Sequence, residues 1–169
     1  MPGTLAALTL ICMLAARCSG LAASSGLSEE QESQIPENAN TIVALSTLSP
    51  DSLYARAQRA LLADGYAIHA SSDAYRTIKT EGKRIGQRLI MRMQMQIIVQ
   101  GREARLVAAG EWIRETTTDA LNTALSGVQA MDEEGRPVAW TTGANRYAFA
   151  KMRLFIASLP HRELSYEIR

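Results

Sequence analysis

The alternation of apolar and polar side chains is strictest over residues 88–100. Every second position there is apolar: Leu89, Met91, Met93, Met95, Ile97 and Val99 alternate with Arg88, Ile90, Arg92, Gln94, Gln96, Ile98 and Gln100. A period of two places the apolar set on one face of a β-strand. After Gly101 the alternation resumes and continues to Trp112. The pattern therefore predicts a long antiparallel hairpin with one apolar face.

Two other segments have helical spacing. Ser49 is a good capping residue, Pro50 suits the first helical position and Asp51 the first turn. With Gly65 as the stop signal, these residues predict a helix over residues 50–64. A second helix is predicted over residues 144–159, where apolar residues recur at helical spacing until Pro160: Ala148, Met152, Phe155, Ile156 and Leu159.

The remaining patterns predict shorter strands. Residues 41–45 are apolar and β-branched, and Tyr66, Ile68 and Ala70 alternate before a turn at 71–73 and a returning strand over 75–80. Residues 116–143 have no clear pattern. This order, β-α-β-β-β-β-α, predicts an α+β domain with an antiparallel sheet of four to five strands and both helices packed on one face.

The first forty residues differ from the rest. Residues 5–16 are apolar and end at Arg17; a bilayer span needs about 20 such residues, so this run has the length of a signal-peptide core instead. Residues 19–40 are polar and contain almost no apolar side chains, which predicts a flexible tether. We therefore expect a signal peptide over 1–17, Cys18 and the tether over 18–40, and a single domain over 41–169.

An apolar run followed by Cys18, small residues and a polar linker resembles the signal of bacterial lipoproteins. The resemblance implies that Cys18 becomes the first mature residue and carries the acyl chains, palmitate among them. Arg17 departs from the family pattern, which has a small residue before the cysteine. An ordinary signal peptide cleaved near Ala22 or Ala23, an uncleaved anchor and a wrongly assigned start therefore stay open as alternatives.

The folded part also resembles a known family. Gly65-Tyr66-x-Ile68, then Asp73, then Ile78-x-Thr80, within the element order above, resembles the helix-grip domains of bacterial envelope lipoproteins, such as the C subunit of the outer-membrane β-barrel assembly machinery. The resemblance implies a non-catalytic, protein-binding domain on an outer-membrane lipoprotein that faces the periplasm. It carries over no catalytic residues.

Charge and cysteine content exclude several functions. The 169 residues include 18 basic and 17 acidic side chains, a net charge of +1, which argues against nucleic-acid binding. Cys12 and Cys18 are the only cysteines, so the domain has no disulfide, thiolate metal site or cysteine nucleophile. His69 and His161 lie in no metal motif, and no G-x-S-x-G motif is present. We expect no enzyme activity, no cofactor and no metal.

Two groups of residues have more than one interpretation. Basic residues cluster between positions 76 and 105, among them Arg76, Lys79, Arg88, Arg92 and Arg105. They would form either a patch for an anionic partner or a solvated sheet face. Met91, Met93 and Met95 form a row along the predicted strand. This methionine row, together with Trp112, would form either core under the C-terminal helix or the lining of a ligand pocket.

These observations leave three functional hypotheses. The first is a non-enzymatic envelope lipoprotein, anchored in the membrane through Cys18, whose domain binds or scaffolds other envelope proteins. The second is a module that binds a small ligand or lipid on the apolar sheet face under the C-terminal helix. The third is a hydrolase without a recognisable motif.

Overall fold

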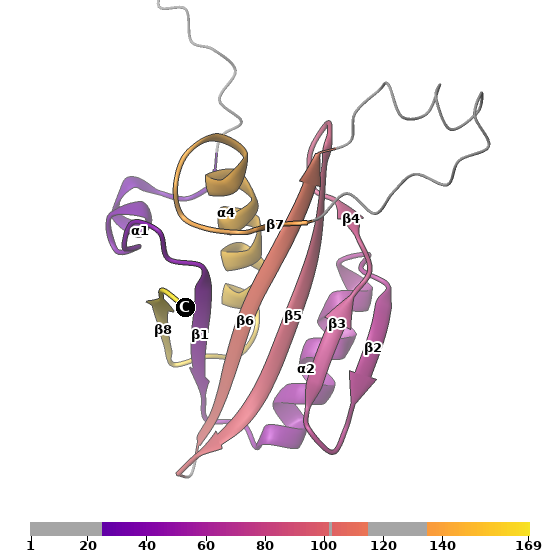
Figure 1. Cartoon of the computed structure of the whole chain (residues 1–169). Helices are drawn as coiled ribbons and strands as arrows, with labels where there is room; N and C mark the ends of the chain where they lie inside the picture. The colour runs from indigo at the N-terminus through magenta and orange to yellow at the C-terminus, as the bar shows by residue number, and fades with distance from the viewer. Residues whose placement is uncertain (1–24, 102, 115–134) are drawn as a thin grey trace, which may run out of the picture.

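The computed structural model describes residues 25–101, 103–114 and 135–169. A twisted antiparallel sheet forms one layer and the longer helices form the other (Figure 1). The elements are α1 Glu29–Ser33, β1 Thr41–Ser46, α2 Pro50–Ala63, β2 Ile68–Ser72, β3 Thr77–Thr80, β4 Lys83–Arg84, β5 Leu89–Gln100, β6 Glu103–Arg114, β7 Arg136–Pro137, α4 Gly143–Ala157 and β8 Glu163–Glu167. The fold is therefore α+β, as predicted.

The predicted long hairpin is confirmed as β5 and β6. The two strands pair along their whole length, with Met91 opposite Trp112 and Met95 opposite Ala108. The middle of the apolar face that the alternation predicts, Met91 to Ile97, is buried, whereas Leu89 at one end is half-buried and Val99 at the other is 62% exposed. Arg92 and Gln94 on the other face are exposed. We call the buried face the inner face and the other the outer face.

Both predicted helices are confirmed, and both pack against the inner face. The Ser49 side chain accepts a hydrogen bond from the Ser52 amide, and Pro50 begins α2. Helix α4 ends at Ala157, two residues before the predicted end. Phe149, Met152 and Ile156 on α4 are fully buried, so this helix closes the core over β1, β5 and β6.

The sheet is wider than the predicted four to five strands. Eight strands are described, in the order β2-β3-β5-β6-β1-β8, with β4 also paired to β5 and β7 to β6. Strand β8 follows Pro160 and pairs with β1, placing Leu164 opposite Ala44. Strand β1 is therefore an interior strand between β6 and β8, which explains why five of its six residues are buried.

The prediction of a flexible tether is wrong for residues 25–40. Helix α1 lies in this segment, and Ile35 and Ala39 are buried in the core at 5% and 0% exposure. The Asn38 amide donates to the Trp140 carbonyl at 2.9 Å, and the Trp140 amide donates to the Ala39 carbonyl at 2.7 Å. The segment is therefore part of the domain. The predicted signal peptide, Cys18 and residues 116–134 lie outside the described residues.

Candidate functional site

The methionine row lies in the core. Met91, Met93 and Met95 are 0–2% exposed, and Trp112 is 5% exposed. The Trp112 indole donates to the Asn145 side chain, which links the first turn of α4 to the sheet. None of these four side chains lines either of the two cavities described below. Their burial favours the structural interpretation of the row over the ligand-binding one.

Three of the five predicted patch residues lie beside an acidic residue. Arg76 forms an ion pair with Asp51 of α2 at 2.6 Å, and Arg105 forms one with Glu167 of β8. Arg92 lies opposite Glu111 in the β5–β6 register. Lys79 of β3 is opposite the uncharged Gln94, and Arg88 is exposed just before β5. This alternation of signs favours a solvated sheet face over a patch of single sign.

The outer face of the sheet carries a shallow hollow of about 300 Å³. It forms over β6 because Ala109 is small, and longer side chains from the neighbouring elements surround it. The lining residues are Asn40, Thr41, Gln94, Gln96, Val107, Ala109, Gly110, Pro137, Val138 and Arg169. The floor of the hollow, at Ala109, therefore carries no large side chain, and the larger side chains lie around it.

Beside the hollow, the outer face has an apolar centre. Val43 of β1 pairs with Val107 of β6 and, although it belongs to the outer face, is only 3% exposed. Leu45 and Ile98 lie in the next row, on either side of Arg105, and are half-buried. No helix of the described chain covers this face (Figure 1).

A larger groove of about 680 Å³ lies on the helix side, where α2, β4 and α4 meet. We call it the helix-layer groove. Its walls are partly apolar and its rim is mainly basic. The lining residues are Ala60, Ala63, Asp64, Tyr66, Lys83, Arg84, Ile85, Lys151, Leu154, Phe155 and Ser158.

The basic rim of the groove is held in place by its neighbours. Lys83 Nζ lies 2.9 Å from Asp64 Oδ2 and 4.7 Å from the centre of the Tyr66 ring. Burial, with a smaller contribution from the Asp64 charge, raises the pKa of the Tyr66 phenol, which therefore stays neutral. Lys151 Nζ lies 5.1 Å from the centre of the Tyr147 ring. The groove thus combines apolar walls with positioned cations.

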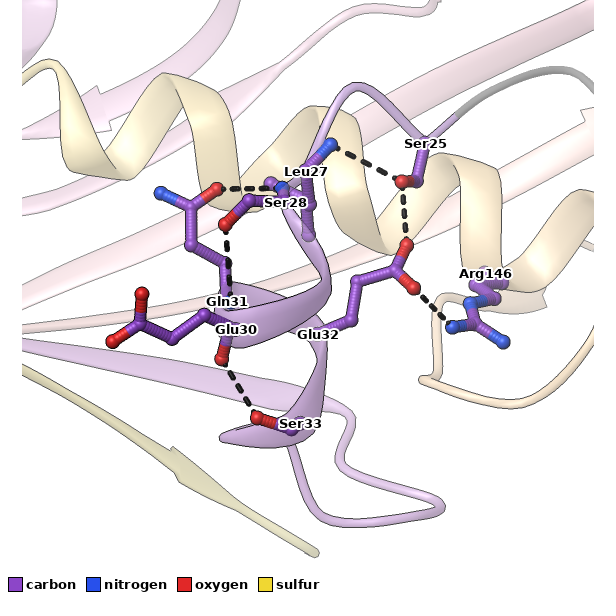
Figure 2. A network of polar contacts seen from close by, with 8 residues as sticks. All are labelled: Ser25, Leu27, Ser28, Glu30, Gln31, Glu32, Ser33 and Arg146. Atoms are coloured by element: carbon purple, nitrogen blue, oxygen red, sulfur yellow. Dashed lines mark hydrogen bonds and ion pairs between the residues drawn. The ribbon is translucent and has the colours of Figure 1, made fainter.

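Helix α1 is fastened to α4 by the polar network in Figure 2. Ser25 Oγ donates to Glu32 at 2.6 Å, and Arg146 of α4 donates to the other Glu32 oxygen at 2.6 Å. The hydrogen bond from Ser25 has the largest effect on the Glu32 carboxyl and lowers its pKa. Burial opposes this, and the hydrogen bond and charge of Arg146 lower the pKa further, so that it lies below its usual value. Ser28 and Gln31 form a capping box at the start of α1.

The described chain begins on the helix side of the molecule. A Cβ placed on Gly26 would lie 3.5 Å from Leu154 Cδ1, and Leu154 also lines the helix-layer groove. The N-terminal segment therefore reaches the domain at the edge of this groove, on the side opposite the outer sheet face (Figure 1). The sequence pattern did not reveal this, because it left residues 25–40 outside the domain.

Both histidines lie away from these surfaces. His69 is exposed on β2, and His161 Nδ1 lies 2.8 Å from the Leu159 carbonyl oxygen. Among residues 25–101, 103–114 and 135–169, no cluster of three His, Cys, Asp or Glu residues is arranged to hold a metal ion. Within the same ranges, no helix combines the length and apolarity that crossing a bilayer requires.

Comparison with known proteins identifies no relative: no protein family matches the chain, and no curated protein matches it.

Proposed function

We propose that this protein is a non-enzymatic lipoprotein of the bacterial envelope, anchored in the outer membrane through Cys18, whose periplasmic domain binds another envelope protein through its outer sheet face. The helix-grip assignment of the domain belongs to this proposal. It is supported by the packing of α4 across β1, β5 and β6.

The observation that carries the proposal is the separation of the two sides of the domain. The described chain begins against Leu154 on the helix side. The outer face lies on the other side of the sheet and has no helix over it. A lipid on Cys18 would therefore connect to the helix side and leave the outer face accessible to a protein partner.

The composition of the outer face suits a protein partner. An apolar centre around the half-buried Val107 is surrounded by charges of both signs, Arg92 and Glu111 among them. Apolar centres with polar rims are typical of protein interfaces. The hollow over Ala109 has room for one or a few side chains of the partner.

A photo-crosslinking amino acid at Ala109 tests the interface in living cells. We expect an adduct with one envelope protein, identified by mass spectrometry, and no adduct from Ala55, which is exposed on α2. The same protein should co-purify with the wild type. The amount recovered should fall at least tenfold with Ala109→Arg but not with Ala55→Arg. Equal losses in both variants, or no adduct from Ala109, would overturn the proposed interface.

The anchor is tested separately by fractionating cells that express the wild type or Cys18→Ala. We expect the wild type in the membrane fraction with a mature N-terminus whose intact mass includes acyl chains, and the variant without either property. A soluble, unmodified protein that begins near Ala23 or Ser24 would remove the lipoprotein part of the proposal and leave the interface to be judged alone.

A further inference from the structure

We propose that the helix-layer groove binds the headgroups of anionic phospholipids, so that the helix side of the domain docks on the membrane surface. The inference adds a second membrane contact to the proposed function and rests on it for the nearness of a bilayer. Three observations support it: the length of chain before Ser25, the charges at the groove rim and the apolar side chains beside them.

The docking of α1 brings the domain close to the proposed anchor. Residues 18–24 separate Cys18 from the first described residue. Seven residues span at most roughly 25 Å when fully extended and about 15 Å on average as a flexible chain. If residues 18–40 were all flexible, the average reach would be about 25 Å. Because residues 25–40 are packed on the domain, the groove edge at Leu154 stays within this short distance of the anchor.

The groove rim is electropositive in a protein that is almost neutral overall. Among the described residues that line the groove, Lys83, Arg84 and Lys151 are basic and Asp64, which pairs with Lys83, is acidic. The exposed surface of α2 adds Arg56 and Arg59. Of the acidic residues of α1, Glu32 is paired with Arg146, and Glu29 and Glu30 face solvent.

These cations are suited to phosphate groups at a surface. Lys83 is directed by Asp64 and by the Tyr66 ring, and Lys151 by the Tyr147 ring, so their ammonium groups are positioned before binding. Each basic residue near an anionic leaflet strengthens membrane association by roughly fivefold. Two removed together should therefore weaken the association by more than tenfold.

Apolar side chains extend beyond the charges. Leu154 is 37% exposed at the groove edge, and Leu62 is 57% exposed on the last turn of α2. Phe155 and Ile85 form the walls between the basic residues. Amphipathic surfaces of this kind insert apolar side chains between headgroups while their cations stay at the phosphates. A free phosphate ion would use only the charged part of the groove.

The test measures sedimentation of the full chain with lipid vesicles. All variants carry Cys18→Ala, so that no acyl anchor contributes. Vesicles of phosphatidylglycerol and phosphatidylcholine are compared with vesicles of phosphatidylcholine alone. The groove variant is Arg84→Gln with Lys151→Gln, and the matched control is Lys79→Gln with Arg92→Gln on the sheet. Circular dichroism and thermal unfolding verify that each variant is folded.

We expect binding that depends on phosphatidylglycerol, that falls at least tenfold in the groove variant and that changes less than twofold in the sheet variant. Equal losses in both variants, or binding that is the same on both vesicle types, would overturn the inference. Complete competition by inorganic phosphate at an equal concentration of phosphate groups would also overturn it. Because the anchor is absent throughout, a failure here is distinct from a failure of Cys18 acylation.

Discussion

Replacing Ile35 by alanine should destabilise the whole domain by about 2–4 kcal/mol. Ile35 follows α1, is 5% exposed and belongs to the main core cluster. The substitution removes three buried carbon atoms, and at about 0.8 kcal/mol for each the transfer term alone is about 2.4 kcal/mol. The cavity that remains adds to this loss, as in other Ile→Ala changes in cores, which cost about 2–5 kcal/mol.

The loss of unfolding free energy is measured by urea unfolding, with tryptophan fluorescence as the signal. Trp140 is suited to this measurement because it is 6% exposed and its backbone is hydrogen-bonded to Asn38 and Ala39. The matched control is Gln34→Ala, one residue earlier and exposed, which should change the free energy of unfolding by less than about 0.5 kcal/mol.

A loss below about 0.5 kcal/mol for Ile35→Ala would refute the reasoning. It would mean that residues 25–40 detach at little cost and unfold independently of the cooperative core. The chain before β1 would then act as a long linker, and the short distance between anchor and groove would no longer follow.

Three further predictions concern single contacts. Thr80→Val removes the acceptor of the buried Met93 amide hydrogen bond, 2.9 Å long, and should cost about 1–3 kcal/mol in urea unfolding, while Thr80→Ser, which keeps the hydroxyl, should cost clearly less. Gly110→Ala places a Cβ 3.0 Å from the Arg92 carbonyl oxygen, so we expect a loss of about 1–3 kcal/mol; an unchanged Tm in a thermal scan would contradict this. The pKa of Glu32 lies below 4.5 in the folded protein, so its carboxylate stabilises the fold above about pH 4.5 and that contribution disappears as the pH falls through the lowered pKa. The stability difference between wild type and Glu32→Gln should therefore shrink between pH 5 and pH 3, and a constant difference over that range would disprove it.

The sequence predicted those elements whose pattern is long or has clear end signals. Strands β5 and β6 show a period of two over most of their length, and α2 has a capping serine, a proline and a closing glycine. Strand β8 was missed because its five residues offer only Leu164 and Tyr166 as an alternating pair. A strand this short is identified by its partner, β1, and not by its own residues.

The surfaces were harder to predict than the fold, because each depends on elements that are distant in the sequence. The helix-layer groove combines α2, β4 and α4, and the hollow combines residues near both ends of the domain with the middle of β5 and β6. The basic residues between 76 and 105 are close in sequence, yet Arg76 and Arg105 form ion pairs with acidic residues on different elements. The polar composition of residues 25–40 concealed the buried Ile35 and the ion pair between Glu32 and Arg146, which together fix that segment to the domain.

The interior position of β1 sets the order in which the domain can be completed. Strand β1 is synthesised before its neighbours, yet it is bordered by β6, which begins at Glu103, and β8, which begins at Glu163. Pairings between such distant segments require the closure of long loops and are slow to form. In the growing chain, β1 therefore has no partner until β6 has been made, and one of its edges stays unpaired until β8 has been made. The domain remains incompletely folded during that time. A chain in this state can still adopt an extended form. Passage through a secretion channel would require such a form.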